Sequence, residues 1–411
     1  MEFLWGTAVA GHQVEGDNVA SDWWDYEERG LLPEKSGKAC DFWNRWRQDL
    51  DLIASLGSSA FRLSVEWARL EPEPGRLDEG ALGRYLEILD GLRARGVEPV
   101  VTLHHFVNPL WFARKGGFEE RANVADFLGH VEKVLPALAP RVRWWVTVNE
   151  PMVYAYFGYA RGYWPPFKKD LGLALRVLGN LLEAHAGAYR LIHRSRPDAM
   201  VSIAKHMRVF EPARPGHPGD RLAASLQDLL SNRAVLEAFR TGRFLGRTVP
   251  GLKGSWDYVG LNYYTRSRVR FVADPAQGFG AEAPPEGETT AMGWEVYPEG
   301  LYRSLRRLGR YGLPVVVTEN GIATEDDEQR VRYLASHLDA LMRARRDGVD
   351  VRGYLYWSLM DNYEWAEGFR PRFGLVEVDF RTLERRPRPS AREFARLKGE
   401  VLRELREVST Q

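Results

Sequence analysis

The sequence contains very little cysteine: Cys40 is the only one in 411 residues, so no internal disulfide can form. Clusters of Cys and His at metal-ligand spacing are also missing. The pair His104 and His105 cannot bind one metal together, because adjacent residues of a strand point to opposite faces. We therefore expect no metal site and no cofactor, and the cysteine usage fits a reducing compartment.

Long apolar runs are absent as well, since no stretch of about 18 apolar residues occurs. The N-terminal residues Met1–Ala8 lack the basic region and sustained apolar stretch of a leader peptide. Lys and Arg number 57 against 56 Asp and Glu, and the net charge of +1 provides no general attraction for nucleic acid or an anionic membrane. We expect a cytoplasmic protein with neither kind of partner, whose function lies in a local site.

Aromatic residues, in contrast, are abundant: they make up 12% of the chain and include 14 Trp, many of them beside polar or charged residues. Sugars present C–H faces that stack on rings and hydroxyls that need hydrogen-bond partners, so sugar sites mix Trp and Tyr with Glu, Asn and His. The pattern favours a carbohydrate site. For any single Trp, a place in the ordinary core remains the alternative.

Short β-rich runs alternate with amphipathic helical stretches along the whole chain, which predicts repeated βα units around a parallel sheet. The predicted strands are Phe3–Ala8, Ala60–Val65, Pro99–Leu103, Val142–Val148, Met200–Ala204, Tyr258–Leu261, Val315–Thr318 and Val351–Tyr356. The predicted helices are Phe42–Leu56, Leu82–Arg95, Asn123–Leu138, Leu171–Arg194, Arg221–Phe239, Pro298–Tyr311, Glu328–Asp347 and Pro389–Leu405. Eight such units predict an α/β fold: a single (β/α)8 TIM barrel with extended βα loops, spanning residues 1–411 as one domain.

Chemistry in such barrels gathers at the C-terminal ends of the strands, where the βα loops meet over one mouth. Every predicted strand except the fifth is followed there by a polar or aromatic residue able to bind a sugar. The stretch 266–290, rich in Pro, Gly, Ala and Glu, is predicted to be a surface excursion after the sixth strand.

Two glutamates stand at the ends of apolar strands: Glu150 after the fourth and Glu319 after the seventh. Burial of an ionised acid is unfavourable without a partner, so one such glutamate alone could be half of a structural ion pair, for example with Arg62. Two of them at one barrel mouth suggest more. Glycosidic cleavage needs paired carboxyl groups, one to protonate the leaving oxygen and one to attack or to activate water.

The segments around these glutamates resemble glycoside hydrolase family 1, the TIM-barrel β-glucosidases and β-galactosidases, and the similarity runs over the whole chain. Residues 147–151 (TVNEP) resemble the family's acid/base motif, and residues 317–321 (VTENG) resemble its nucleophile motif. The resemblance implies a retaining, exo-acting β-glycosidase with Glu319 as nucleophile and Glu150 as general acid/base. Its partner would be a small β-glycoside or an oligosaccharide.

The same resemblance implies roles for other strand-end residues. It assigns the binding of sugar hydroxyls to Gln13, His105 and Asn149, the stacking platform to Trp357, and the far edge of the sugar to Glu364 and Trp365. It assigns the closing of the pocket to Phe373, the platform for the leaving group to Trp294, and the orientation of Glu319 to Arg62, Tyr264 and Asn262. Tyr264 would also contact substrate.

Charge suggests how the two glutamates divide their work. We expect Glu319, beside Arg62, to titrate low, and its negative charge to raise the pKa of Glu150. Phe106 stands where the family usually has Trp, and Val107 and Asn108 replace a common acidic-aliphatic pair. These departures leave the sugar preference open among glucosides, galactosides and fucosides.

Two alternative functions remain. In a 6-phospho-β-glycosidase, Ser, Lys and Tyr would serve the phosphate near the position of Glu364, a carboxylate that repels phosphate. A silent sugar-binding relative would lack one of the two glutamates, and a plant-type thioglucosidase would have a neutral residue in place of Glu150. Transfer of the sugar to an acceptor other than water runs through the same intermediate as hydrolysis and stays open.

Overall fold

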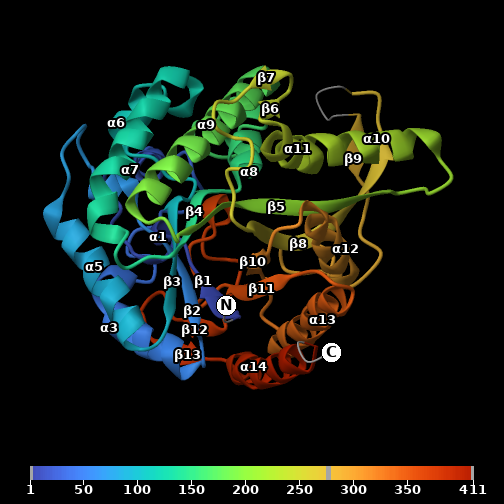
Figure 1. The fold of residues 1–411 in the computed structure, drawn as a ribbon. Helices are drawn as coiled ribbons and strands as arrows, with labels where there is room; N and C mark the ends of the chain where they lie inside the picture. The colour runs from blue at the N-terminus through green and yellow to red at the C-terminus, as the bar shows by residue number, and fades with distance from the viewer. Residues whose placement is uncertain (1–2, 275–278, 409–411) are drawn as a thin grey trace.

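A computed structural model describes residues 3–274 and 279–408. Residues 1–2 and 409–411, and residues 275–278 of the predicted surface excursion, lie outside the described residues. Eight strands pair in parallel around a closed ring, from β1 through β11 and back to β1 (Figure 1). They are β1 (Leu4–Ala8), β2 (Ala60–Ser64), β3 (Glu98–His104), β4 (Trp144–Asn149), β5 (Met200–Pro212), β8 (Val259–Phe271), β10 (Val315–Asn320) and β11 (Val351–Trp357). The predicted TIM-barrel fold is confirmed.

Helices surround the barrel, and most occupy the predicted ranges (Figure 1). The long ones are α3 (Phe42–Ser55), α5 (Glu79–Ala94), α7 (Val124–Leu138), α9 (Leu171–Ser195), α10 (Pro218–Asp228), α11 (Ala234–Thr241), α12 (Pro298–Leu308), α13 (Asp327–Arg346) and α14 (Pro389–Val408). Three of them begin after an aspartate whose side chain accepts a hydrogen bond from a backbone N–H of the first turn, namely Asp78, Asp170 and Asp326. Across the part of the chain that the structure describes, none of the helices combines the length and the apolar character needed to cross a membrane.

Shorter elements occupy the connections. The helices are α1 (Gly11–Val14), α2 (Asp22–Glu28), α4 (Trp67–Leu70), α6 (Leu110–Arg114) and α8 (Pro151–Ala155), and the strands are β6 (Arg243–Phe244), β7 (Arg247–Thr248), β9 (Gly280–Glu282), β12 (Val376–Val378) and β13 (Arg385–Pro387). Single turns of 3-10 helix lie at Gly117–Glu119, Arg121–Asn123, Gly309–Tyr311 and Trp365–Glu367, and π-helical turns lie at Tyr156–Ala160 and Leu229–Arg233.

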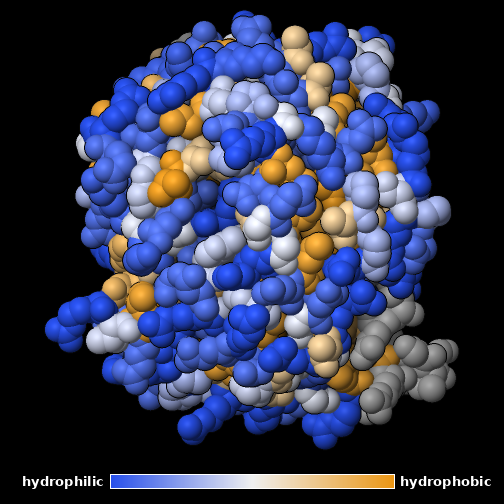
Figure 2. Space-filling view, turned by 90° about the vertical axis from the view of Figure 1, so that its left-hand side faces the viewer, coloured by the Kyte–Doolittle hydropathy of each residue, from blue (hydrophilic) through white to orange (hydrophobic). Residues whose placement is uncertain are grey.

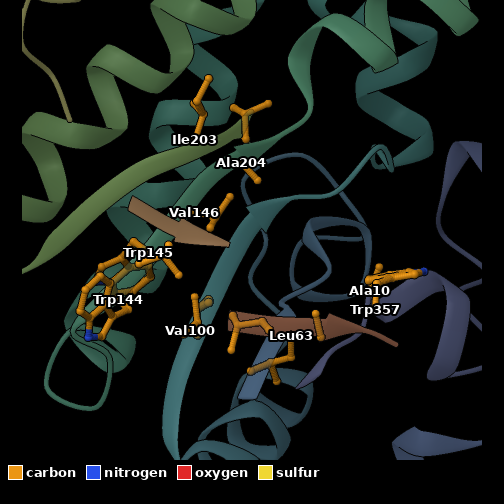
Figure 3. Close-up of a cluster of buried hydrophobic side chains, with 14 of the residues drawn as sticks. Ala10, Leu63, Val100, Trp144, Trp145, Val146, Ile203, Ala204 and Trp357 are labelled. Atoms are coloured by element: carbon orange, nitrogen blue, oxygen red, sulfur yellow. The ribbon is translucent and has the colours of Figure 1, made fainter. Parts of the chain in front are cut away.

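One large apolar core joins the strands to the surrounding helices. Figure 3 shows a part of it, where Leu63, Val100, Val146 and Ala204 come from the neighbouring strands β2 to β5. The surface is different in character: the face seen in Figure 2 is mostly hydrophilic, with only small apolar areas between the polar groups. Burial of the apolar runs in this core therefore stabilises the barrel that positions the strand ends.

Two strands are much longer than predicted. β5 and β8 continue past the barrel and pair with each other from Val209–Arg266 to Pro212–Val269, and β9 adds to β8 in antiparallel fashion. The predicted surface excursion 266–290 thus begins as strand up to Phe271. In β8 the residues Arg266, Arg268 and Arg270 do alternate with the buried Ser267 and Val269, but this buried face is too short and too polar to predict a strand from the sequence.

The predicted helix Arg221–Phe239 is also different, because a π-helical turn at Leu229–Arg233 divides it into α10 and α11. A π turn adds one residue to a helical turn and shifts the side chains that follow, so an apolar repeat continues through it with a changed phase.

Candidate active site

Glu150 and Glu319 lie at the same end of the barrel: Glu150 directly follows β4, and Glu319 is the last but one residue of β10. Both side chains are buried, with exposed fractions of 7% for Glu150 and 4% for Glu319. The backbone of Glu150 has a φ of 41°, in the left-handed region that non-glycine residues rarely adopt, and Phe106 and Trp365 share this property. Such strain persists only where the surroundings enforce it, and it gathers at functional sites.

The carboxylate of Glu319 is held at both oxygens. Arg62, fully buried on β2, donates from Nη1 to Oε1 at 2.7 Å, and the hydroxyl of Tyr264 donates to Oε2 at 2.6 Å. Charge-assisted hydrogen bonds of this length are strong and favour the ionised carboxylate. Glu319 is therefore oriented by β2 and β8 together.

Asn262 connects the two glutamates. Its Nδ2 donates to Glu150 Oε1 at 2.8 Å and to Asn149 Oδ1 at 3.2 Å, and its backbone pairs with that of Glu319 where β8 meets β10. The amide is fixed because Thr318 donates to its Oδ1 at 2.6 Å. Asn262 was predicted to orient Glu319, and the structure places it between both carboxyl groups.

The pKa values of these acids rise on burial. Burial raises the pKa of Glu150 to about 8, with the negative charge of Glu319 as the next contribution. Burial also raises the pKa of Glu319, against the opposing effects of Arg62 and Tyr264. The expectation that Glu319 titrates low is wrong in direction, because the sequence shows the neighbouring Arg62 but not how completely the carboxylate loses water.

Two further buried groups at the mouth keep one polar atom each without a partner among the described residues: Gln13 Oε1 and His105 Nδ1. Gln13 uses its nitrogen to donate to Tyr363 O at 2.8 Å and to Glu364 Oε2 at 3.1 Å, so its oxygen remains an acceptor. Burial raises the pKa of Glu364 to about 8, followed by the effect of Glu319.

The protonation of His105 follows from its neighbours. Arg62 donates to Asn149 Oδ1 at 2.6 Å, so the Nδ2 of Asn149 is the donor toward His105 Nε2 at 3.0 Å. Burial and the charge of Arg62 hold the pKa of His105 well below its usual range. The ring is neutral, and Nδ1 carries the hydrogen. The site thus offers one unpartnered acceptor on Gln13 and one unpartnered donor on His105, which suits sugar hydroxyls.

His104, the neighbour of His105, points away from this mouth, as expected for successive residues of a strand. Its Nε2 lies 3.0 Å from Asn108 Oδ1, and its ring packs edge-on against Phe118 and Tyr154.

Rings line the site on two sides. Trp357 and Trp365 both stack near His105, with ring centroids 5.9 and 6.0 Å away. Phe373 and Trp294 lie on the Tyr264 side, and their rings are 6.1 and 5.5 Å from that of Tyr264. The structure thus brings all the sequence-predicted site residues to one mouth. These rings can contact the C–H faces of a sugar and its leaving group.

Lys205 was not singled out from the sequence, because the fifth strand was predicted to end at Ala204. The side chain is 1% exposed, and its Nζ donates to the backbone oxygens of His206 and, at 2.8 Å, of Ser231. Burial lowers the pKa of Lys205 to about 7, and the nearby charge of Glu150 opposes that effect. Had the fifth strand been predicted one residue longer, Lys205 would have been recognised as a strand-end residue, and a buried lysine close to a buried acid is a candidate for a functional site.

The profile described as glycosyl hydrolase family 1 matches residues 1–250 and 245–400. The chain belongs to this family. It is a β-glycosidase, and the family predicted from the two motifs is confirmed. "Beta-glucosidase A" of Thermotoga maritima is 35% identical over 93% of this chain and 94% of its own length, and a "Bifunctional beta-D-glucosidase/beta-D-fucosidase" of Bifidobacterium breve is 34% identical over 93% and 94%.

Solved structures of this family superpose closely on the chain. A β-glycosidase from Pyrococcus horikoshii is 47% identical, with a TM-score of 0.92 over 96% of this chain and 93% of its own. A β-glucosidase from Thermotoga maritima in complex with glucoimidazole is 32% identical, with a TM-score of 0.91 over 97% of this chain and 98% of its own. The family 1 fold therefore extends over nearly the whole chain.

Proposed function

We propose that this glycosidase removes the terminal sugar from unphosphorylated β-glucosides, β-galactosides or β-fucosides with retention of configuration, using Glu319 as nucleophile and Glu150 as acid/base. The observation that carries the proposal is the unequal setting of two adjacent carboxyl groups. Glu319 receives hydrogen bonds from Arg62 and Tyr264, whereas Glu150 receives one from the neutral Asn262. The residues 1–411 would act as one catalytic domain.

The first step joins the sugar to the enzyme. At neutral pH the pair holds one proton, on Glu150, whose pKa is raised to about 8 by burial and, next, by the charge of Glu319. Glu319 attacks the anomeric carbon as Glu150 gives its proton to the leaving oxygen, and the C–O bond to the aglycone breaks.

In the second step the covalent bond has neutralised Glu319, so the pKa of Glu150 falls and the residue becomes a base. It takes a proton from water, which attacks the anomeric carbon and releases Glu319. Another sugar in place of water gives transglycosylation. Retention requires carboxyl groups about 5–5.5 Å apart. A short separation is supported by Asn262, whose side chain donates to Glu150 and whose backbone pairs with that of Glu319, and by the effect of the Glu319 charge on the pKa of Glu150, which is raised first by burial.

The glycone would lie beside Gln13, His105 and Trp357. Gln13 Oε1 and His105 Nδ1–H would bind hydroxyls, and Trp357 would contact the C–H face of the ring. Trp294 and Phe373, on the side of Tyr264, would contact the leaving group and close the pocket. The proposal covers the three related sugars because the departures at Phe106, Val107 and Asn108 leave the sugar preference open.

Phosphorylated substrates are the main alternative. A phosphate at the far edge of the sugar needs cationic partners. Glu364 supplies none, whether it is ionised or, with a pKa of about 8, neutral. The relatives "Beta-glucosidase A" and the β-glucosidase/β-fucosidase are named for unphosphorylated sugars. A silent sugar-binding protein is disfavoured because both glutamates are present. A cytoplasmic location is likewise our proposal, and it rests on the sequence.

The test measures p-nitrophenol release from the β-glucoside, the β-galactoside and the 6-phospho-β-glucoside. We expect turnover of an unphosphorylated substrate and a loss of about 10³-fold or more in Glu319→Ala, with added azide restoring turnover to an α-glycosyl azide. Glu71→Gln is the matched control, since Glu71 is also buried but pairs with His130 and Lys133, which are not among the proposed site residues. Activity confined to the 6-phospho substrate, or a β-configured azide product, would contradict the proposal.

A further inference from the structure

A second cavity, of about 370 Å³, lies outside the proposed glycosidase site. Its walls are the outward continuation of β5, helix α10, the π-helical turn that follows it, and helix α12. Both helices pack against β5, and Figure 1 shows α10 and α12 on either side of that strand's outer part. The charged groups lining it are Arg208, Arg221, Arg233, Arg303, Arg307 and Asp228.

The charge in this cavity is strongly unbalanced, because five arginines face a single lining carboxylate. Asp228 is already shared: Arg307 donates to both of its oxygens, at 2.7 and 3.3 Å, and Arg233 donates at 2.7 Å. Arg303 pairs with Glu211, which lies on β5 but does not line the cavity. One carboxylate cannot neutralise two guanidinium groups, so the cavity keeps an excess of positive charge.

Arg208 adds an unpartnered donor. Its Nε is buried and has no hydrogen-bond partner in residues 3–274 and 279–408. The nearest carboxylate oxygen is Glu282 Oε1, 3.6 Å from Nη2, too far for a hydrogen bond. A buried donor on a cation is unfavourable when left unpaired, and an anion in the cavity would remove that penalty.

We propose that this cavity binds the phosphate group of a small phosphate monoester. Planar guanidinium groups recognise phosphate oxygens in pairs, and several around one cavity form a site for a doubly charged group. The volume of about 370 Å³ lies within the range of small-molecule sites and leaves room for the organic part of the monoester. Within the described residues the glycone pocket has no comparable cluster of arginines, so the phosphate would bind here without entering that pocket.

The experiment is calorimetric titration of the full chain with inorganic phosphate and with glucose 6-phosphate, at an ionic strength fixed with sodium chloride. We expect saturable binding of both ligands. Arg208→Gln should weaken it about tenfold or more, because a charge-assisted hydrogen bond and a full charge are lost. Arg221→Gln, on the exposed face of α10, should weaken it several-fold and serves if the first variant is poorly folded.

Two control variants test whether the ligand binds in this cavity. Arg270→Gln removes an exposed arginine of β8 that does not line the cavity, and its binding should equal that of the wild type. Glu319→Gln should also bind as the wild type does. Absence of saturable binding for both ligands, equal weakening in Arg208→Gln and Arg270→Gln, or a changed affinity in Glu319→Gln would each overturn the proposal, the last by moving the ligand to the sugar pocket.

Discussion

The substitution Tyr264→Phe removes one hydroxyl from the site and leaves the aromatic ring in place. That hydroxyl donates to Glu319 Oε2 at 2.6 Å, while Arg62 holds the other oxygen at 2.7 Å. A hydrogen bond to a charged group contributes about 1.5–3 kcal/mol. Since 1.36 kcal/mol corresponds to one pKa unit, losing it should raise the pKa of Glu319 by about 1–2 units.

The assay is the dependence of kcat/KM on pH for a p-nitrophenyl β-glycoside. The proposed nucleophile must be ionised, so activity falls as the pH drops through the pKa of Glu319. A higher pKa in Tyr264→Phe therefore moves the acid limb of the profile to higher pH by about 1–2 units. The maximal rate should also decrease, because Glu319 loses one of the contacts that orient it.

Tyr263→Phe is the matched control. Tyr263 is the preceding residue of β8 and is also buried, but its hydroxyl donates to the backbone oxygen of Tyr297 at 2.6 Å and not to Glu319. This variant should lose stability without any displacement of the acid limb. An unmoved limb in Tyr264→Phe, or the same displacement in both variants, would refute the reasoning.

Three further predictions concern buried titratable groups. Activity should fall as the pH rises through about 8, where Glu150 loses its proton, and Glu150→Gln should abolish this alkaline limb on an activated aryl glycoside, checked by pH–rate profiles. Cys40 should resist an aromatic disulfide reagent in the native protein and react in guanidinium chloride, because burial raises the pKa of its thiol; absorbance at the released thiolate follows the reaction. Arg385→Met should lower the free energy of unfolding by about 3–5 kcal/mol in urea titrations, since it leaves the buried carboxylate of Asp49 without its two hydrogen bonds at 2.9 Å, and a normal Tm would contradict this.

The sequence was informative where one local pattern decides the structure. The strand β10 begins with the apolar β-branched residues Val315, Val316 and Val317, and β4 is also apolar. Because each glutamate lies at the C-terminal end of such a run, their meeting at one mouth could be predicted. The outer parts of β5 and β8 could not be predicted in this way, because they continue as strands past the barrel by pairing with each other. Lys205 went unnoticed for that reason.

The net pKa of Glu319 shows a different limit. The sequence places a cation on a neighbouring strand, but the loss of water around a carboxylate depends on every side chain that packs over it. Arg62 was therefore found while the larger effect of burial was not.

The contact between Gln13 and Glu364 joins residues 351 positions apart, from the first and last parts of the barrel. During synthesis a chain that has emerged only through β10 already contains Gln13, His105 and both catalytic glutamates, but lacks Trp357, Glu364 and Trp365. These three residues are therefore the part of the sugar pocket that is synthesised last. A sugar that contacts both Gln13, after β1, and Glu364, after β11, would hold the first and last strands of the barrel together. By mass action it would favour the closed barrel over partly opened states.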